Sequence, residues 1–201
     1  MDVQFITSSP DLKGRPELIL PEFAFIGRSN CGKSSLINHF LDRKKIAKIS
    51  GKPGKTRLLN YFLVEERYYL VDLPGYGFAK VSKDLRARWK ELFRKFLMDS
   101  ERPLAIFHLL DSRHKPTKED VEFSKLLQES GHPFAIAATK IDKVGTNALP
   151  THYQEIIETL GVSSEIPFFP TTAAKRKGRL EMLAWVDALT EAYEEDNDEA
   201  E

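Results

Sequence analysis

The sequence has almost no cysteine and no long apolar run, and each absence excludes a class of protein. Cys31 is the single cysteine among 201 residues, which excludes an intramolecular disulfide and a zinc site built from cysteines. The sequence contains no run of 18 apolar residues, so it predicts no membrane span. The first residues lack the pattern of a secretory signal. We therefore expect a cytoplasmic protein with one α/β core.

The formal net charge is zero, but acidic and basic residues are unevenly distributed along the chain. Residues 191–201 carry seven acidic residues and no basic one, which leaves 30 basic against 23 acidic residues in the remainder. Without apolar periodicity, residues 194–201 are predicted to form a disordered acidic tail. Solvation of this tail is the simplest interpretation, and shielding of the basic body is the alternative.

The sequence does contain a phosphate-binding motif. Residues 23–26 are typical of a buried strand, residues 27–34 fit G-x-x-x-x-G-K-[ST], and helical apolar spacing follows over 36–41. The backbone N–H groups of such a loop surround a phosphate, and the helix that follows adds its positive dipole end. Lys33 would reach the β- and γ-phosphates, and the Ser34 hydroxyl would ligate Mg²⁺. The alternative is a glycine-rich turn that fits the motif by chance.

A second motif follows a predicted antiparallel hairpin over residues 58–71. Asp72-Leu73-Pro74-Gly75 comes directly after its apolar second strand, where an acidic residue of a phosphate-loop protein holds Mg²⁺ through water. Gly75 can offer its N–H to the γ-phosphate because no side chain blocks the approach. Alone this tetrapeptide is a common turn, but in this context it predicts a γ-phosphate sensor.

A third motif predicts which base is bound. An apolar strand leads into Thr139-Lys140-Ile141-Asp142. The Asp142 carboxylate can accept from the N1–H and the 2-amino group of guanine together, whereas adenine would leave the charge unpaired. The Lys140 stem would lie against the purine. Thr172-Ala173-Ala174 follows the next predicted strand, and the Ala173 N–H would meet guanine O6, with a shift of one residue left open.

Basic residues gather outside these motifs. Residues 43–57 hold seven basic and no acidic residues, and their glycines and proline disfavour regular structure. The helix predicted over 83–99 also has a basic face. We expect both segments to bind RNA backbone, with Lys175-Arg176-Lys177-Arg179 as the alternative surface. Solvation without a partner is the default for such charges.

Together these motifs resemble those of a known family. G-R-S-N-C-G-K-S, K-P-G-K-T-R, D-L-P-G-Y-G-F-A, D-S-R-H-K-P-T, T-K-I-D and T-A-A-K are similar to the EngB (YihA/YsxC) family of bacterial GTP-binding proteins, within the TrmE–Era–EngA–EngB group. The resemblance implies an α/β fold with a single Ras-like P-loop GTPase domain over residues 23–193, after an edge strand and loop in 1–22. It implies a mostly parallel sheet with one antiparallel hairpin and helices on both faces.

The resemblance also implies a function. Such a protein binds GTP and GDP, hydrolyses GTP slowly with Mg²⁺, acts in large ribosomal subunit assembly and is needed for normal cell division and septation. The expected partner is ribosomal RNA or the large-subunit precursor, bound by a monomer, with no DNA and no membrane. The alternatives are an RNA-binding module in which hydrolysis is incidental and a nucleotide phosphotransferase.

Site residues are carried over by their positions in the motifs. Ser34 and Thr56 would ligate Mg²⁺, with Asp72 acting through water, and Lys33, Thr56, Gly75 and Asn30 would serve catalysis. The nucleotide-binding residues implied in this way are Gly27, Arg28, Ser29, Asn30, Cys31, Gly32, Lys33, Ser34, Ser35, Gly54, Lys55, Thr56, Arg57, Leu58, Asp72, Leu73, Pro74, Gly75, Thr139, Lys140, Ile141, Asp142, Thr172, Ala173 and Ala174.

Two of the motif positions bear on the rate of hydrolysis. Tyr76 occupies the place of the glutamine that orients the attacking water in Ras-like enzymes, so intrinsic hydrolysis is expected to be slow. Asn30 occupies the place where related GTPases hold a potassium ion, which would offset charge developing at the phosphates. The alternative is that Asn30 only hydrogen-bonds its own backbone.

Two further side chains carry expectations from their surroundings. Cys31 is expected to have a reactive thiol, protected by bound nucleotide, because a helix N-terminus and Lys33 favour the thiolate. An inert side chain that fills space in the loop is the alternative. His108 lies inside the apolar stretch 104–110 and is expected to be a core histidine with a hydrogen-bond partner.

Overall fold

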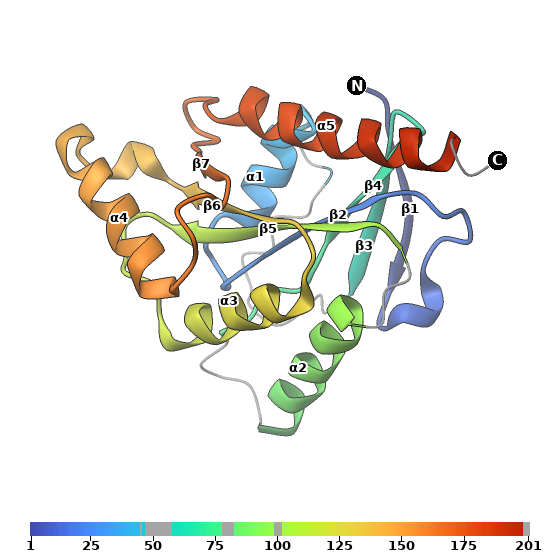
Figure 1. Ribbon diagram of the computed structural model, residues 1–201, viewed down its shortest axis with the longest axis horizontal. Coiled ribbons are helices and arrows are strands. Elements are labelled where there is room, and N and C mark those ends of the chain that lie inside the picture. The colour runs from blue at the N-terminus through green and yellow to red at the C-terminus, as the bar shows by residue number, and fades with distance from the viewer. Residues whose placement is uncertain (45, 47–57, 78–82, 99–101, 199–201) are drawn as a thin grey trace.

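A single seven-stranded sheet forms the centre of the protein, for which a computed structural model describes residues 1–44, 46, 58–77, 83–98 and 102–198 (Figure 1). The strand order is β1-β3-β4-β2-β5-β6-β7, and β3 alone runs in the opposite direction to the other six strands. The predicted α/β fold, with its parallel sheet and antiparallel β3–β4 hairpin, is therefore confirmed. The strands are β1 Val3–Ser9, β2 Glu22–Gly27, β3 Leu59–Val64, β4 Tyr68–Asp72, β5 Leu104–Asp111, β6 Phe134–Thr139 and β7 Phe168–Pro170.

Helices cover both faces of the sheet, as predicted (Figure 1). α1 and α5 pack on one face, and α2, α3 and α4 pack on the other. No helix within the described ranges is long and apolar enough to cross a membrane. The α-helices are α1 Lys33–Phe40, α2 Lys83–Met98, α3 Lys118–Ser130, α4 Leu149–Leu160 and α5 Arg179–Asp198, and the short 3₁₀ helices are η1 Leu12–Gly14, η2 Ile141–Lys143 and η3 Thr146–Ala148.

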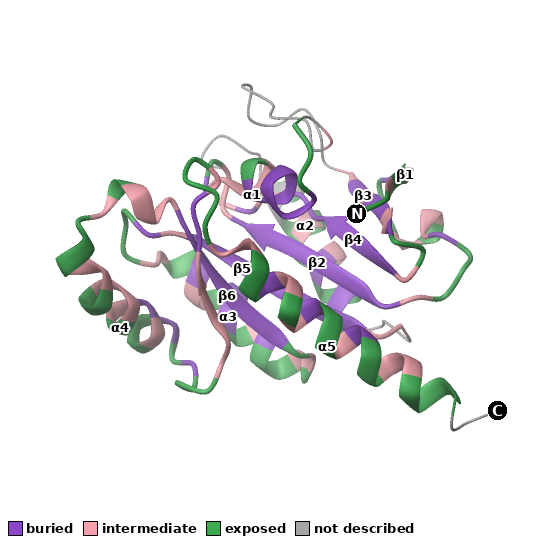
Figure 2. Cartoon of the chain, turned by 90° about the horizontal axis from the view of Figure 1, so that it is seen from above, coloured by how far each residue is buried: buried purple, intermediate pink, exposed green. Residues whose placement is uncertain are grey.

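The central strand β2 is covered on both sides. All six of its residues are buried, and Figure 2 shows the neighbouring strands buried as well. On the α1 and α5 side, Phe25 packs against Phe40 and Phe107, with ring centroids 5.4 and 4.7 Å away, and Phe107 contacts Trp185. Burial on both faces is typical of a parallel strand. The phosphate-binding motif thus extends from a fully buried strand at the centre of the sheet.

The parallel strands bring the predicted motifs to one edge. β2 pairs in parallel with β4 and β5, and β5 pairs in parallel with β6. The residues that end these strands, Gly27, Asp72, Asp111 and Thr139, are therefore close in space although 112 positions separate the first from the last. Ligands of open α/β sheets bind at the carboxyl ends of the strands, so this edge is the expected location of the site.

The start of α3 is fixed by a capping box. Thr117, the N-cap residue, accepts a hydrogen bond from the Asp120 N–H through its hydroxyl oxygen. The Asp120 carboxylate in turn accepts from the Thr117 N–H over 2.7 Å. This reciprocal pair satisfies two backbone donors of the first turn. It also fixes the orientation of the Asp120 side chain.

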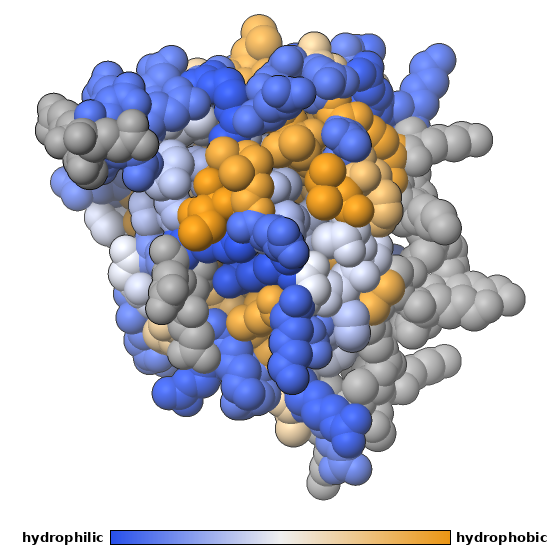
Figure 3. Space-filling model, turned by 90° about the vertical axis from the view of Figure 1, so that its right-hand side faces the viewer, coloured by the Kyte–Doolittle hydropathy of each residue, from blue (hydrophilic) through white to orange (hydrophobic). Residues whose placement is uncertain are grey.

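At the opposite edge, β1 forms the predicted edge strand. It pairs only with β3, and Phe5 on it is 54% exposed although its ring contacts Phe62 edge-on. Leu18 and Ile19, in the segment before β2, are also exposed. Figure 3 views the molecule from the side on which the chain terminus and the end of α5 lie in Figure 1, and hydrophobic patches interrupt a hydrophilic surface there.

The predicted disorder of residues 194–201 is wrong for residues 194–198, which continue α5 to Asp198. Arg67, in the β3–β4 turn, donates through Nε and Nη2 to the two carboxylate oxygens of Glu194, over 2.9 and 2.7 Å. A bidentate arginine–carboxylate pair of this kind fixes geometry as well as charge. Local composition could not indicate this order, because the residue that pairs with Glu194 lies 127 positions away in the sequence.

Candidate nucleotide-binding site

Both glycines of the phosphate-loop motif are required by the geometry of the loop. Gly32, which caps α1, has a φ of 101°, a left-handed conformation that favours glycine. A Cβ on Gly27 would lie 2.6 Å from the Leu109 carbonyl oxygen and 2.7 Å from the Cys31 sulfur. Larger residues at these positions would force the loop open, so the spacing of the motif follows from its shape.

The lysine and the acid predicted to serve phosphate and Mg²⁺ lie side by side. Lys33, the first residue of α1, donates from Nζ to Asp72 Oδ1 at the end of β4. The other oxygen, Asp72 Oδ2, accepts from Asn60 Nδ2 over 3.4 Å. Asp72 is 8% exposed, so its charge is held at the loop by these two partners. Ser34 and Ser35 follow Lys33 in the first turn of α1.

Gly75 packs directly on the phosphate loop. A Cβ there would lie 3.1 Å from the Gly27 carbonyl oxygen and 3.2 Å from the Ser29 nitrogen, which is tighter than most real contacts. The next residue, Tyr76, donates its N–H to the Gly27 carbonyl, and its own carbonyl accepts from the Ser29 N–H over 2.9 Å. The backbone immediately after the 72–75 motif is thus hydrogen-bonded to the backbone of the loop.

The two motifs predicted to contact the base also meet. Asp142 Oδ1 accepts from Thr172 Oγ1 over 2.6 Å, and the Ile141 N–H donates to the Thr171 carbonyl. The Thr172 hydroxyl, together with Lys143, holds the pKa of the Asp142 carboxyl below its usual range. Asp142 is therefore a carboxylate at neutral pH and can accept hydrogen bonds. Ala173 and Ala174 follow in the turn after β7.

Lys140 connects the base-contacting motif to the phosphate loop. Its Nζ donates to the Asn30 carbonyl oxygen over 2.6 Å and to Asp111 Oδ2 over 2.8 Å. Its Cε lies 3.4 Å from where a Cβ on Gly32 would be. The neighbouring Thr139 hydroxyl donates to the Cys31 carbonyl. The lysine stem thus lies over the phosphate loop, and its contact with a purine stays a prediction.

Asp111 begins the D-S-R-H-K-P-T motif but was not predicted to be a site residue. Burial alone would raise the pKa of its carboxyl, but hydrogen bonds from Arg113 and Lys140 outweigh that effect and lower the pKa to about 2. Asp111 therefore stays ionised and orients Lys140. The sequence signal was present, because Asp111 ends an apolar strand in the same way as Asp72 does.

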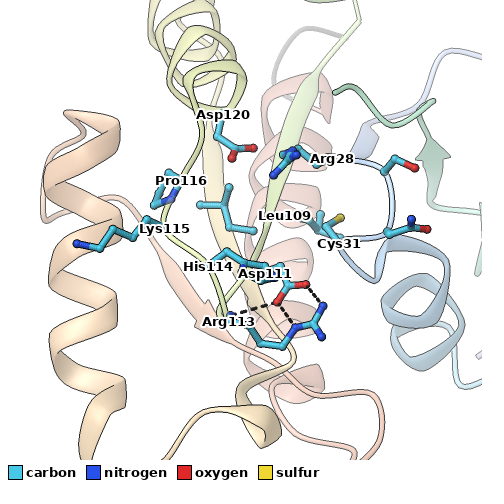
Figure 4. Close-up of a pocket in the computed structure, with 12 residues that line it drawn as sticks. Arg28, Cys31, Leu109, Asp111, Arg113, His114, Lys115, Pro116 and Asp120 are labelled. Atoms are coloured by element: carbon cyan, nitrogen blue, oxygen red, sulfur yellow. Dashed lines mark hydrogen bonds and ion pairs between the residues drawn. The ribbon is translucent and has the colours of Figure 1, made fainter. Parts of the chain in front are cut away.

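A cavity of about 220 Å³ lies between the phosphate loop and the segment that joins β5 to α3. Figure 4 shows Arg28 and Cys31 on one side of it and Asp111, Arg113 and Asp120 on the other. Asn30 lines the cavity and has a φ of 66°. The structure thus places residues 28–31 between the motifs on one side and this cavity on the other.

Other predicted site residues fall outside these contacts. Leu73 and Pro74 are buried, and Leu58 is half-buried just before β3. The remaining predicted residues belong to the K-P-G-K-T-R motif, here called the first switch, and lie outside the described residues; they are Gly54, Lys55, Thr56 and Arg57.

The prediction that Cys31 is reactive is wrong. Cys31 is 3% exposed, and burial raises the pKa of its thiol to about 11 against the opposing effect of Lys33. Desolvation outweighs both the nearby ammonium and the helix N-terminus, because the thiolate would lose its water. The alternative of an inert loop side chain is the one supported.

We expect Cys31 to be alkylated slowly by iodoacetamide at pH 8, whether or not GDP is bound. With a pKa of about 11, only about one thiol in a thousand is ionised at this pH. Mass spectrometry of the modified peptide over time measures the rate, and guanidinium-unfolded protein supplies the matched rate of an exposed thiol. Equal rates in folded and unfolded protein would contradict the burial of this side chain.

Comparison with known proteins identifies the family. Residues 22–140 match the family described as 50S ribosome-binding GTPase. A protein of Porphyromonas gingivalis named "Probable GTP-binding protein EngB" is 40% identical over 192 residues, covering 93% of this chain and 94% of that protein. One of the same name from Cytophaga hutchinsonii is 42% identical over 193 residues, covering 94% and 96%. The chain belongs to the EngB family.

Solved structures agree with this family. The crystal structure of a probable GTP-binding protein engB matches with a TM-score of 0.68 and 26% identity, over 85% of this chain and 99% of that one. Era in complex with MgGDPNP and nucleotides 1506–1542 of 16S ribosomal RNA matches with a TM-score of 0.61 and 26% identity, over 87% and 57%. The predictions of a P-loop GTPase, of GTP and GDP binding and of GTP hydrolysis are therefore confirmed for this EngB-type chain.

Proposed function

We propose that this EngB-type GTPase uses the difference between its GTP and GDP states to control docking on the large ribosomal subunit precursor, and that its loss impairs cell division and septation. The observation that carries the proposal is the convergence of the γ-phosphate motif and the base motif on one phosphate loop. Tyr76 and Lys140 each bond that loop directly. A switch needs such a link between nucleotide state and backbone position. The ribosome-binding description of the matching family supports the partner.

Nucleotide chemistry is assigned to residues as follows. Lys33 neutralises the β- and γ-phosphates, Gly75 donates its N–H to the γ-phosphate, and Asp142 selects guanine. Asp142 Oδ1 accepts from the hydroxyl of Thr172, and Lys143 Nζ lies 3.5 Å from Oδ2, so both carboxylate oxygens have a partner that orients them. A nucleotide phosphotransferase would not need this carboxylate, which argues against that alternative.

The residues at the loop fit a Mg²⁺ ion. Asp72 offers a carboxylate and Ser34 a hydroxyl, and hard oxygen ligands are those that Mg²⁺ prefers. In the described part of the chain no three His, Cys, Asp or Glu side chains gather into a protein-only metal site. The ion would therefore complete its shell with phosphate oxygens and water, and Thr56 is the proposed ligand from the first switch. Bound there, Mg²⁺ offsets the charge that develops on the phosphates.

The docking surface that we favour lies beside the base motif, and we name it the rim surface. It consists of exposed Arg43 and Lys44 after α1 and exposed Lys175 and Lys177 before α5. The two segments are tied together, since Arg176 pairs with Asp42 over 2.5 Å and Arg179 Nε donates to the Phe40 carbonyl. Cations held on one surface can contact successive phosphates.

The basic face of α2 is the weaker candidate. Lys90 pairs with Glu122 over 2.6 Å, and Lys95 pairs with Glu91. Exposed Arg88 and Arg94 remain, without an ion pair to any described residue, but α2 lies on the opposite face of the sheet from α1. We therefore expect ribosomal RNA at the rim surface. This keeps the start of the predicted segment 43–57 but replaces helix 83–99 with the alternative basic residues before α5.

Reversing two charges on the rim surface is expected to release the protein from ribosomal particles. Lys44→Glu with Lys177→Glu should weaken binding strongly while GTP affinity changes little. The matched control is Arg88→Glu with Arg94→Glu on α2, which should retain binding. Cosedimentation with precursor particles in GTP and in GDP measures the effect, and log affinity should fall with log salt by about 0.7 to 0.9 per phosphate contacted.

The outcomes separate the surfaces and the alternatives. If only the Arg88→Glu, Arg94→Glu variant is released from the particles, the interface lies on α2. If neither variant is released, neither surface binds the RNA backbone. Equal cosedimentation in GTP, GDP and a non-hydrolysable GTP analogue would favour the RNA-binding module in which hydrolysis is incidental.

A further inference from the structure

The side chain of Tyr76 is directed into the core, away from the phosphate loop that its backbone contacts. Tyr76 is 8% exposed, and its ring stacks on Phe123 of α3 with centroids 5.2 Å apart and planes inclined by 22°. Its hydroxyl lies 2.6 Å from His108 Nε2 in β5 and 2.7 Å from Asp120 Oδ1 in α3. One residue thus connects the γ-phosphate motif, the central sheet and α3.

Each proton in this network has one position. The Asp120 carboxylate can only accept, and its other oxygen already accepts from the Thr117 N–H and hydroxyl. The single Tyr76 hydroxyl proton therefore points to Asp120, and His108 Nε2–H must donate to the Tyr76 oxygen. Burial lowers the pKa of His108 to about 4, which keeps the ring neutral, and Nδ1 has no partner among the described residues, as an unprotonated nitrogen permits.

The anchored side chain is continuous with the backbone that faces the phosphates. Tyr76 N–H donates to the Gly27 carbonyl over 3.1 Å, and Ser29 N–H donates to the Tyr76 carbonyl over 2.9 Å. Gly75 immediately before it contacts the loop, and Gly77 immediately after it has a φ of 78°. The hydrogen bonds of the Tyr76 hydroxyl therefore hold in place a residue whose backbone N–H and carbonyl are both bonded to the phosphate loop.

We propose that Tyr76 is a positioning residue for the γ-phosphate: its hydroxyl, held by His108 and Asp120, keeps the Gly75 N–H at the phosphate loop before GTP binds. This rests on the proposed contact between Gly75 and the γ-phosphate. A preformed donor costs no rearrangement on binding, whereas a donor present only part of the time weakens apparent affinity by its population. GDP has no γ-phosphate, so its affinity does not depend on this donor.

The test compares Tyr76→Phe with Tyr61→Phe, a matched loss of one buried hydroxyl. Tyr61 in β3 is fully buried, and its hydroxyl accepts from Arg15 Nε over 3.2 Å, outside the candidate site. Tyr76→Phe should lower the affinity for a non-hydrolysable GTP analogue, and the single-turnover hydrolysis rate, about five- to tenfold, the effect of one lost hydrogen bond on a two-state equilibrium. GDP affinity should stay within about twofold of wild type. Tyr61→Phe should lower thermal stability and leave the GTP-to-GDP affinity ratio unchanged.

An unchanged ratio in Tyr76→Phe overturns the proposal. Asp120→Asn serves as the second variant, because one amide oxygen cannot accept from both Tyr76 and the Thr117 donors, and it should lower the same ratio. Gly75→Ala separates this proposal from the one on which it rests. A ratio unchanged in Gly75→Ala would refute the γ-phosphate contact itself. A ratio lowered in Gly75→Ala but normal in Tyr76→Phe and Asp120→Asn would refute the anchor alone.

Discussion

Asp142→Asn is expected to lower GTP affinity at least about a hundredfold and to raise the affinity for xanthosine triphosphate. The Asp142 carboxylate would accept two hydrogen bonds from guanine, and each bond to a charged group contributes about 1.5–3 kcal/mol. An amide turns one acceptor into a donor, which opposes the guanine 2-amino group and suits the 2-carbonyl of xanthine. A loss of about 2.7 kcal/mol corresponds to the hundredfold change.

The fold of the site should survive this substitution. Thr172 Oγ1 donates to Asp142 Oδ1, and the oxygen of asparagine can accept the same bond. Thr172→Val is the matched control, since it removes the orienting hydroxyl while keeping the carboxylate, and it should weaken GTP binding less and without any gain for xanthosine triphosphate. Titration of both nucleotides by calorimetry checks the exchange of preference. Unchanged GTP affinity in Asp142→Asn would mean that this carboxylate does not contact the base.

The motifs and secondary-structure elements that could be predicted from the sequence are those defined by residues close together in the chain. Gly27, Lys33 and Ser34 fall in one motif, and the apolar strand and helix beside them are local patterns as well. The capping box of α3 is equally local, since Thr117 and Asp120 are three positions apart. Local patterns of this kind are dictated by backbone geometry, so they need no knowledge of the tertiary fold.

The features not predicted depend on partners distant in sequence. Glu194 is ordered by Arg67, and Tyr76 is held by Asp120, 44 positions further on. The prediction that Cys31 is reactive was wrong for a related reason. The motif shows which residues neighbour Cys31 in the sequence, but not the distant residues that bury its side chain. Desolvation and long-range pairing arise only when the sheet has assembled, which is why composition and spacing did not indicate them.

Potassium is expected to accelerate GTP hydrolysis about a hundredfold over sodium, the lower end of what one well-placed electrostatic contact contributes in a transition state. The Tyr76 hydroxyl is committed to Asp120, so it cannot orient the attacking water. Some other group must therefore offset the charge that develops between the β- and γ-phosphates. We propose that Asn30 holds a potassium ion there, as the resemblance to related GTPases implies.

The alternative, in which Asn30 only bonds its own backbone, has little support. Its side chain is exposed, and the hydrogen bonds within the described ranges include none from its amide, while its carbonyl oxygen accepts from Lys140. The amide oxygen is thus available to a cation. Single-turnover hydrolysis in matched potassium and sodium chloride, for wild type and Asn30→Ala, tests the proposal. Asn30→Ala should lose the potassium effect while keeping GDP affinity, because Lys140 bonds the backbone of residue 30 and not its side chain. Wild-type rates that are equal in the two salts would leave Asn30 without a role in catalysis.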